Sequence, residues 1–342
     1  MTAEPGATGE IRPAIGIVAN PASGKDIRRL IANAPTSTLA EKYSIVRRSV
    51  IGAAEVGVKA FYFLPEPHRI CSRAVETLSL DATYHHAAID ERYNELDTVH
   101  AVQVMREAGC AAIITLGGDG TNRAATLGWR EAPLLPISTG TNNVFPNFVE
   151  ATVAGEAAGL VAAGHVSLSD VATQAKVVEV DVDDEPADLA LIDAVLVNER
   201  FVGSRALFDA DALRVAVMTR AEPAAVGISS IGGLLHPVDA QTDGGLCLRF
   251  STQPGSGRLR APIAPGLYQT IPIGSFAPLE LEETVEVTGP GILAFDGERQ
   301  RALAAGQRAR LRITRTGPLV IDPARALRLA AQEHTFVHET GS

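Results

Sequence analysis

The sequence predicts an α/β protein: a doubly wound parallel α/β domain comes first, an all-β, sandwich-like domain follows, and a C-terminal helix packs back on the first domain. In the first half of the chain, short runs that are apolar on both faces alternate with helical patterns. Such runs are typical of strands in a parallel sheet that helices cover on both faces. After about residue 165, alternating segments separated by Gly and Pro replace the helical patterns, and they favour an all-β domain.

The elements of the first domain follow from its apolar residues. Those between Leu96 and Met105 recur at a spacing of about 3.6 residues, so they predict a helix, and Gly109 marks its end. Repeated strand–helix units are joined by right-handed crossovers, which place their strands parallel. The strands that we expect are 14–19, 59–64, 111–116 and 133–137.

In the rest of the chain, Gly and Pro pairs mark the turns between short strands. A final helical pattern covers 323–333. We therefore expect an N-terminal α/β domain over 1–165, an all-β domain over 166–320 and a C-terminal segment over 321–342 that returns to the first domain. The expected strands after the first domain are 176–182, 189–197, 284–288, 292–295 and 309–313.

Charge and cysteine content exclude several classes of protein. The 342 residues carry a net charge of −10, and binding of nucleic acid or of an anionic membrane needs a positive face, so neither partner is expected. No apolar run approaches the ~18 residues that span a bilayer. The three cysteines form no Cys-x-x-Cys pair, and the first ten residues lack a signal-peptide pattern. Both features favour a reducing cytoplasm.

The strongest motif is the run Gly117, Gly118, Asp119, Gly120 and Thr121, which follows one buried strand and precedes a helical stretch. Glycines let the backbone approach a phosphate chain closely, and the amides at the start of the helix form an anion site. Asp119 then has two alternative roles: it holds a metal bound to the phosphates, or it accepts the proton of an attacking hydroxyl. A tight turn with an Asp cap is the structural alternative.

A second loop follows the first strand and contains Asn20, Ser23, Gly24 and Lys25. It is not a Walker A loop, because no glycine precedes Gly24 by five residues. The amides of Ser23 and Gly24 and the ammonium of Lys25 are nevertheless suited to phosphate oxygens. A capping turn is the alternative.

A third loop, with Thr139, Gly140, Thr141 and Asn142, repeats the Gly-Thr-Asn string that begins at Gly120. Both strings lie on strand-to-helix turns, and ligands of open parallel sheets bind along the carboxyl edge where such turns meet. We therefore expect the third loop to bind substrate, with a helix cap as the alternative.

Together, these strings resemble the superfamily of NAD kinases, diacylglycerol-type lipid kinases and phosphofructokinases. Asn198 and Glu199 look like the Asn-Glu pair of NAD kinases, and Asp296 to Glu298 looks like the Asp-Gly-Glu element of the lipid kinases. The combination of NPASGKD, GGDGTNRAA and ISTGTNNVFP most resembles the acetoin catabolism protein X branch, which is ATP-NAD kinase-like. The resemblance covers roughly Ile15 to Asp322.

The resemblance implies a kinase whose first domain binds ATP and whose β domain binds the acceptor. It implies that Mg²⁺ accompanies the nucleotide and that the phosphoryl group passes to a hydroxyl of a small molecule, with NAD as one candidate. Asp119, Asp296 and Glu298 are then the candidate catalytic residues, and Asn198 and Glu199 orient the acceptor. A solvated strand end at 198–199 and a hairpin turn at Asp296-Gly297 are the alternatives. A homodimer or homotetramer is also implied, and no metal ligand is assigned.

One departure from the NAD kinase pattern concerns the acceptor. The Thr-Pro-Thr-Gly-Ser-Thr-Ala-Tyr string that precedes the Gly-Gly…His-Pro element in NAD kinases is replaced here by Arg220–Ile231. A site that lacks the side chains that hydrogen-bond a substrate binds that substrate much more weakly. The resemblance therefore supports phosphoryl transfer better than it supports NAD as acceptor. Two alternatives remain: a lipid kinase, and a nucleotide-binding regulator without catalysis.

Overall fold

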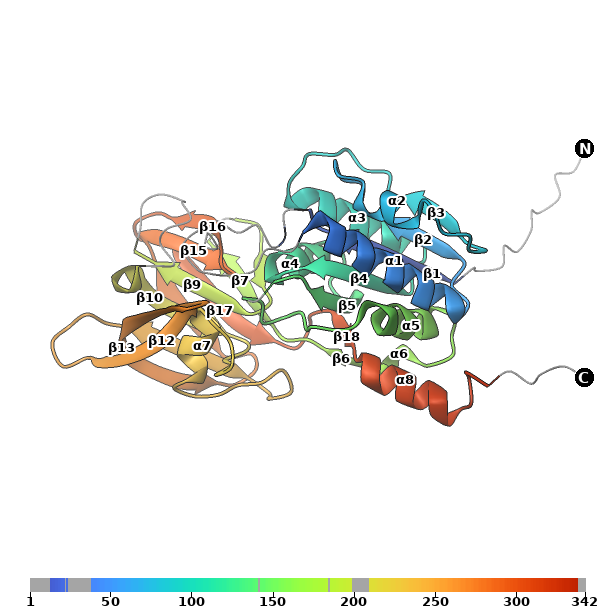
Figure 1. The fold of residues 1–342 in the computed structure, drawn as a ribbon. Helices are drawn as coiled ribbons and strands as arrows, with labels where there is room; N and C mark the ends of the chain where they lie inside the picture. Colours follow the sequence, from blue (N-terminus) through green and yellow to red (C-terminus); the bar gives the residue numbers. More distant parts are fainter. Residues whose placement is uncertain are drawn as a thin grey trace, which may run out of the picture.

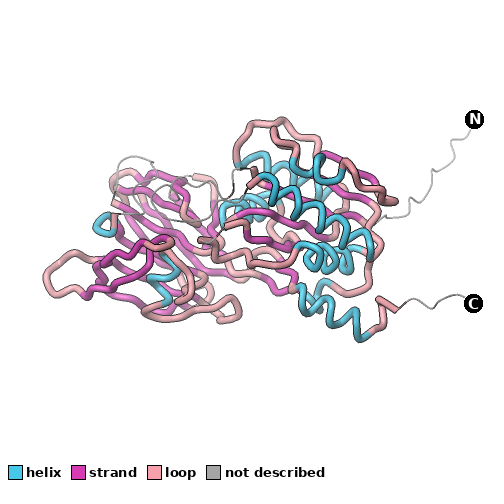
Figure 2. Tube along the Cα trace, viewed as in Figure 1, coloured by secondary structure: helices cyan, strands magenta, loops and turns pink. Residues whose placement is uncertain are grey.

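The computed structural model describes residues 13–21, 23, 38–140, 142–183, 185–198 and 209–337, with the backbone alone at 299 and 300. It consists of two domains side by side (Figure 1). Helices are concentrated in the first domain, whereas the second is built almost entirely from strands (Figure 2). The predicted fold class is confirmed. No helix among the described residues is long and apolar enough to cross a membrane.

The first domain contains a seven-stranded sheet in the order β3-β2-β1-β4-β5-β18-β6. β1 pairs in parallel with β2 on one side and with β4 on the other, so the direction of winding reverses between β1 and β4. In sheets of this kind the crevice at the reversal is where ligands bind. The first strands are β1 (Ala14–Ala19), β2 (Ala60–Phe63), β3 (Thr83–His86), β4 (Ala112–Gly117) and β5 (Pro133–Ser138).

Helices cover both faces of this sheet (Figure 1). On one face α1 and α5 pack closely, because Gly155 has no Cβ: one added there would lie 1.9 Å from the Ser49 carbonyl oxygen. On the other face, α3 ends just before Gly109, as predicted, and Gly109 has a φ of +78°. The helices are α1 (Leu39–Glu55), α2 (Ile70–Val75), α3 (Glu95–Glu107), α4 (Asp119–Gly128), α5 (Ala151–Ala162) and α6 (Leu168–Val171).

The second domain is a sandwich of two antiparallel sheets, in the orders β14-β17-β7-β8 and β12-β13-β11-β10-β9-β15-β16. Val180, Val217, Leu293 and Leu311 belong to the buried apolar cluster between them. Its strands are β7 (Val177–Val182), β8 (Asp188–Ala190), β9 (Asp193–Val197), β10 (Leu213–Met218), β11 (Gly245–Phe250), β12 (Gly257–Ala264), β13 (Leu267–Leu279), β14 (Thr284–Thr288), β15 (Gly291–Phe295), β16 (Glu298–Leu303) and β17 (Arg308–Thr314). The short helices are η3 (Ala210–Ala212) and α7 (Ile228–Gly233).

The single strand predicted over 189–197 is wrong. It is divided into β8 and β9, which belong to different sheets. The division lies at Leu191 and Ile192, whose amides donate to the Asp296 carboxylate at 2.9 and 2.7 Å. A side chain distant in sequence thus takes the hydrogen bonds that would continue a ladder.

The chain returns to the first domain at its end (Figure 1). β18 (Leu319–Ile321) pairs in parallel with β5 and antiparallel with β6 (Ala172–Gln174). The predicted last helix is α8 (Pro323–Gln332), which is capped by Asp322 and packs against α5. The first sheet therefore includes two strands from outside the expected range 1–165. β6 lies after the expected border at 165/166, and β18 crosses the expected border at 320/321.

Arg123 connects the two domains from the interior. Arg123 lies on α4 and is only 3% exposed. The guanidinium donates to the Leu189 carbonyl oxygen at 2.7 Å and to Asp188 at 2.6 Å, and it lies 5.3 Å from the centre of the Phe295 ring. Because both partners in the pair are shielded from water, this contact holds the domains more firmly than a surface ion pair would.

Replacement of Arg123 by Met therefore leaves Asp188 with a weakened set of partners in the interior. We expect Arg123→Met to lower the free energy of unfolding by about 3 kcal/mol, measured by chemical denaturation. Arg130→Met is the matched control, because Arg130 bridges the same two domains through Glu179 with its side chain 35% exposed. It is expected to cost about 1 kcal/mol or less, and equal losses in the two variants would contradict the assignment.

Candidate active site

Three of the predicted loops meet at the carboxyl edge of the first sheet. The Asn20 side-chain amide donates to the Thr121 hydroxyl at 2.8 Å, which joins the loop after β1 to the loop after β4. The Thr139 hydroxyl donates to the Ser23 hydroxyl at 3.0 Å, which joins the loop after β5. These contacts place the three loops around the crevice between β1 and β4.

The glycines after β4 are required by close neighbours. A Cβ on Gly117 would lie 2.3 Å from the Thr121 hydroxyl oxygen, and one on Gly118 would lie 2.7 Å from Asn143 Oδ1. A Cβ on Gly120 would lie 2.8 Å from Glu298 Oε1. The last contact brings an acidic side chain of β16 against the glycine loop, so the second domain closes one side of the site. The loop runs into the first turn of α4, whose amides favour anions.

Lys42 supports the loop after β1 through hydrogen bonds from the protein interior. Its side chain on α1 is fully buried, and its ammonium donates to the carbonyl oxygens of Asn20, Pro21 and Ser23 at 2.8, 3.2 and 2.7 Å. These three hydrogen bonds join the loop after β1 to α1. Sequence reasoning missed Lys42, because a lysine in a helical stretch ordinarily indicates the solvent face.

The Asp119 carboxylate is held by backbone amides from the third loop. Its Oδ1 accepts from Val144 at 3.1 Å and from Phe145 at 2.8 Å, whereas Oδ2 accepts only from Val144, at 3.2 Å. Burial, and then the negative charge of Asp296, raise the Asp119 pKa to about 7, against the opposing effects of the two amides and of Arg220. A carboxyl group with this pKa exchanges a proton near neutral pH.

Asp296 has a different environment. It lies at φ +52° in the turn between β15 and β16 and is 8% exposed. Its Oδ2 accepts from Leu191, and its Oδ1 accepts from Ile192 and, at 3.3 Å, from Asp193. Burial raises its pKa, and the amides and Arg123 oppose the rise. The alternative of a hairpin turn is confirmed by the pairing of Phe295 with Glu298, and the carboxylate anchors the backbone. A catalytic role for Asp296 stays a prediction.

Asn198 lies away from these residues. β9 begins at Asp193, whose carbonyl oxygen accepts from the Asp296 amide, and ends at Val197, which pairs with Ile292. At about 3.3 Å per residue, Asn198 is roughly 16 Å along the strand from this contact, and its side chain is exposed. Asn198 is therefore remote from Asp296, and its role in orienting the acceptor stays a prediction. The other predicted residues, Gly24, Lys25, Thr141 and Glu199, fall outside the described residues.

Arg220, like Lys42, is a residue of the site that sequence reasoning did not assign. Its Nη1 donates to the Val144 carbonyl oxygen at 3.0 Å, and its guanidinium carbon lies 5.1 Å from the centre of the Phe145 ring. The one available signal was its position at the start of the segment that departs from the NAD kinase pattern.

The described residues do not form a metal site of their own. They contain no group of three or more His, Cys, Asp or Glu side chains suited to a metal ion. The oxygens of Asp119 and Asp296 already accept hydrogen bonds from backbone amides. We therefore derive no step through Mg²⁺.

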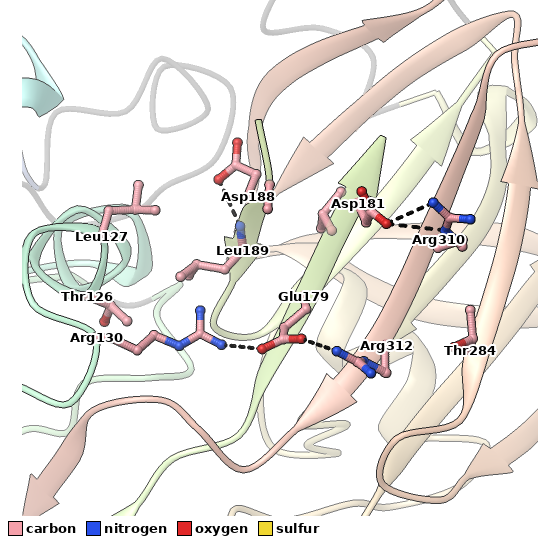
Figure 3. A pocket seen from close by; sticks show the side chains of 12 residues that line it. Thr126, Leu127, Arg130, Glu179, Asp181, Asp188, Leu189, Thr284, Arg310 and Arg312 are labelled. Atoms are coloured by element: carbon pink, nitrogen blue, oxygen red, sulfur yellow. Dashed lines mark hydrogen bonds and ion pairs between the residues drawn. The ribbon is translucent and has the colours of Figure 1, made fainter. Parts of the chain in front are cut away.

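A separate groove of about 590 Å³ lies between the end of α4 and the four-stranded sheet (Figure 3). Arg130 and Arg312 both donate to Glu179 there, at 2.8 and 2.7 Å. Arg310 donates to Asp181 at 2.9 Å. Because these charges neutralise each other, the groove is poorly suited to a phosphate chain, and the candidate site stays at the start of α4.

The geometry agrees with comparisons to known proteins. The model of the ATP-NAD kinase N-terminal domain matches residues 15–166, and that of the acetoin catabolism protein X C-terminal domain matches 176–316. The chain is 37% identical to acetoin catabolism protein X of Cupriavidus necator, over 96% of this chain and 95% of the relative. The crystal structure of yeast NADH kinase with NADH has a TM-score of 0.52 at 13% identity, and the match covers 98% of this chain and 91% of that one. It shares the fold.

The three hydrogen bonds of Lys42 lead to a stability prediction. In Lys42→Met the carbonyl oxygens of the first loop lose a buried donor, and we expect a loss of about 3 kcal/mol in the free energy of unfolding. Lys59→Met is the control, because Lys59 pairs with Asp81 at a surface where the two side chains are 45% and 94% exposed. It should cost about 1 kcal/mol or less. A Lys42→Met variant as stable as the control would show that the loop does not need this support.

Proposed function

We propose a phosphotransferase function for this chain, which belongs to the acetoin catabolism protein X family. It transfers the terminal phosphoryl group of ATP to a hydroxyl of a small molecule. The observation that carries the proposal is Asp119: a carboxyl group with a pKa raised to about 7 stands at the first turn of α4, beside a glycine loop.

The glycine loop and the first turn of α4 bind the phosphates. Backbone amides at a helix start bind anions through their partial positive charge. Gly117 and Gly118 let the chain pass closely beside the side chains of Thr121 and Asn143. Most of catalysis in phosphoryl transfer is positioning and charge stabilisation, which is what a rigid loop of amides supplies.

Asp119 accepts the proton of the attacking hydroxyl. Its Oδ1 is occupied by the amides of Val144 and Phe145, and its Oδ2 has a single, longer contact. A carboxylate oxygen can accept more than one hydrogen bond, so Oδ2 keeps capacity for a proton. As the oxygen of the acceptor forms its bond to phosphorus, the bond from phosphorus to the bridging oxygen of ATP breaks, ADP leaves, and the hydroxyl proton passes to Oδ2. A base with a pKa near the operating pH performs this transfer best.

The acceptor is a small hydroxylated molecule, and the name of the Cupriavidus necator relative directs the choice towards the compounds of acetoin catabolism. NAD remains a candidate acceptor from the resemblance to NAD kinases. Assembly as a homodimer or homotetramer, and a cytoplasmic location, also stay predictions from that resemblance and from the sequence.

Asp119→Asn tests the proposed base. The amide side chain cannot take up the proton, so we expect turnover to fall roughly 10²- to 10⁴-fold. The measurement is ADP release with ATP and a panel of acetoin-related diols, hydroxyketones and NAD. Asp81→Asn, at an exposed surface pair, is the control. If the wild-type chain binds ATP but releases no ADP with any acceptor of the panel, it is a regulator and not an enzyme. Near-wild-type turnover in Asp119→Asn would exclude this base.

The raised pKa of Asp119 also predicts a pH dependence. Only the ionised base acts, so kcat/KM should fall about tenfold per pH unit below the pKa of about 7. The protonated carboxyl contributes stability below its unfolded pKa of 3.8, and this contribution is lost as the pH rises through the folded pKa. Asp119→Asn should therefore gain thermal stability relative to wild type between about pH 4 and pH 8. An acid limb near the unperturbed pKa would contradict the assignment.

A further inference from the structure

Asp119 and Arg220 hold the same dipeptide from opposite domains. Asp119 accepts from the amides of Val144 and Phe145. Arg220 donates to the Val144 carbonyl oxygen and lies over the Phe145 ring. The dipeptide belongs to the loop after β5, and Arg220 follows β10. The two charged groups are thus brought to one place by a segment that both of them contact.

The charge of Arg220 is only partly used by this contact. A guanidinium has five N–H donors in a planar fork, and the structure shows one of them on the Val144 carbonyl oxygen. Among the described residues, no ion pair joins Arg220 to a carboxylate. The acidic groups whose charge raises the pKa of Arg220 are Asp119, Glu222 and Asp239. The charge of Arg220 in turn lowers the pKa of Lys176.

A purely structural role explains Arg220 poorly. A carbonyl oxygen needs only a neutral donor, whereas burial of a cation costs free energy, and here burial lowers the pKa of Arg220. Arg214, on β10, shows the ordinary case, with its Nη1 donating to the Pro290 carbonyl oxygen at 2.9 Å in a hydrogen bond that is exposed to solvent. A half-buried guanidinium beside a reacting carboxyl group is suited to a bidentate oxyanion.

We propose that Arg220 binds a phosphate-type oxyanion next to Asp119. The oxyanion is the terminal phosphate of the donor or a phosphate on the acceptor. This inference rests on the proposed function and extends it, because it names the group that recognises the anion. It also gives the departure from the NAD kinase pattern a chemical meaning: where NAD kinases have hydroxyls, this chain has a cation.

Calorimetric titration of the full chain with ATP, ADP and inorganic phosphate tests the inference. The variants are Arg220→Met, Arg220→Lys and the matched control Arg214→Met, each checked for folding by its melting temperature. Loss of a hydrogen bond to a charged group corresponds to roughly a 10- to 100-fold weaker affinity. We expect Arg220→Met to show this loss, Arg220→Lys to recover part of it, and Arg214→Met to bind as wild type does.

The probes separate the two sources of the oxyanion. Weaker ATP binding with ADP binding kept identifies the terminal phosphate of the donor. Kept ATP and ADP binding with inorganic phosphate binding lost identifies a phosphate of the acceptor. If a folded Arg220→Met binds all three as wild type does, Arg220 is a structural contact and the inference is overturned. If wild type binds phosphate through Arg220 but binds no ATP, the inference stands and the proposed function fails. If wild type binds none of the three, both fail.

Discussion

The hydrogen bonds from Val144 and Phe145 to Asp119 are the interaction on which the candidate site depends. A buried carboxylate is costly unless hydrogen bonds satisfy it, so these two amides decide whether Asp119 remains at the edge of the sheet. They also fix the loop after β5, on which Arg220 of the second domain rests. The segment of Val144 and Phe145 thereby fixes the positions of Asp119, the proposed base, and of Arg220 in the β domain relative to each other.

Two carboxylates at this edge show how backbone partners separate roles. Asp296 accepts from three amides through both oxygens, which makes it part of the scaffold that separates β8 from β9. Asp119 accepts from two amides, mostly through one oxygen, and keeps capacity on the other. Their mutual repulsion raises the pKa of Asp119, so the carboxylate that anchors the backbone also affects the protonation of the proposed base.

Buried cations complete the arrangement. Lys42 holds the loop after β1 by its carbonyl oxygens, and Arg123 joins the start of the β domain to α4. Each cation has several acceptors, which offsets the cost of taking its charge out of water. Together with Arg220 they distribute positive charge inside a chain whose net charge is −10.

The sequence by itself determined the parallel strands β1, β2, β4 and β5, the helices α3 and α8, and the glycine turn at the end of β4, and it offered the hairpin turn at Asp296 as an alternative. These depend on periodicity and on local backbone conformation, which neighbouring residues fix. The tertiary structure alone decided which carboxylate oxygens are occupied, that Lys42 is internal, and that Arg220 faces Asp119. Those outcomes join residues that are distant along the chain, such as Asp296 and Leu191, 105 positions apart. Local patterns carry no information about such pairs, because only the packing of the two domains brings them within reach.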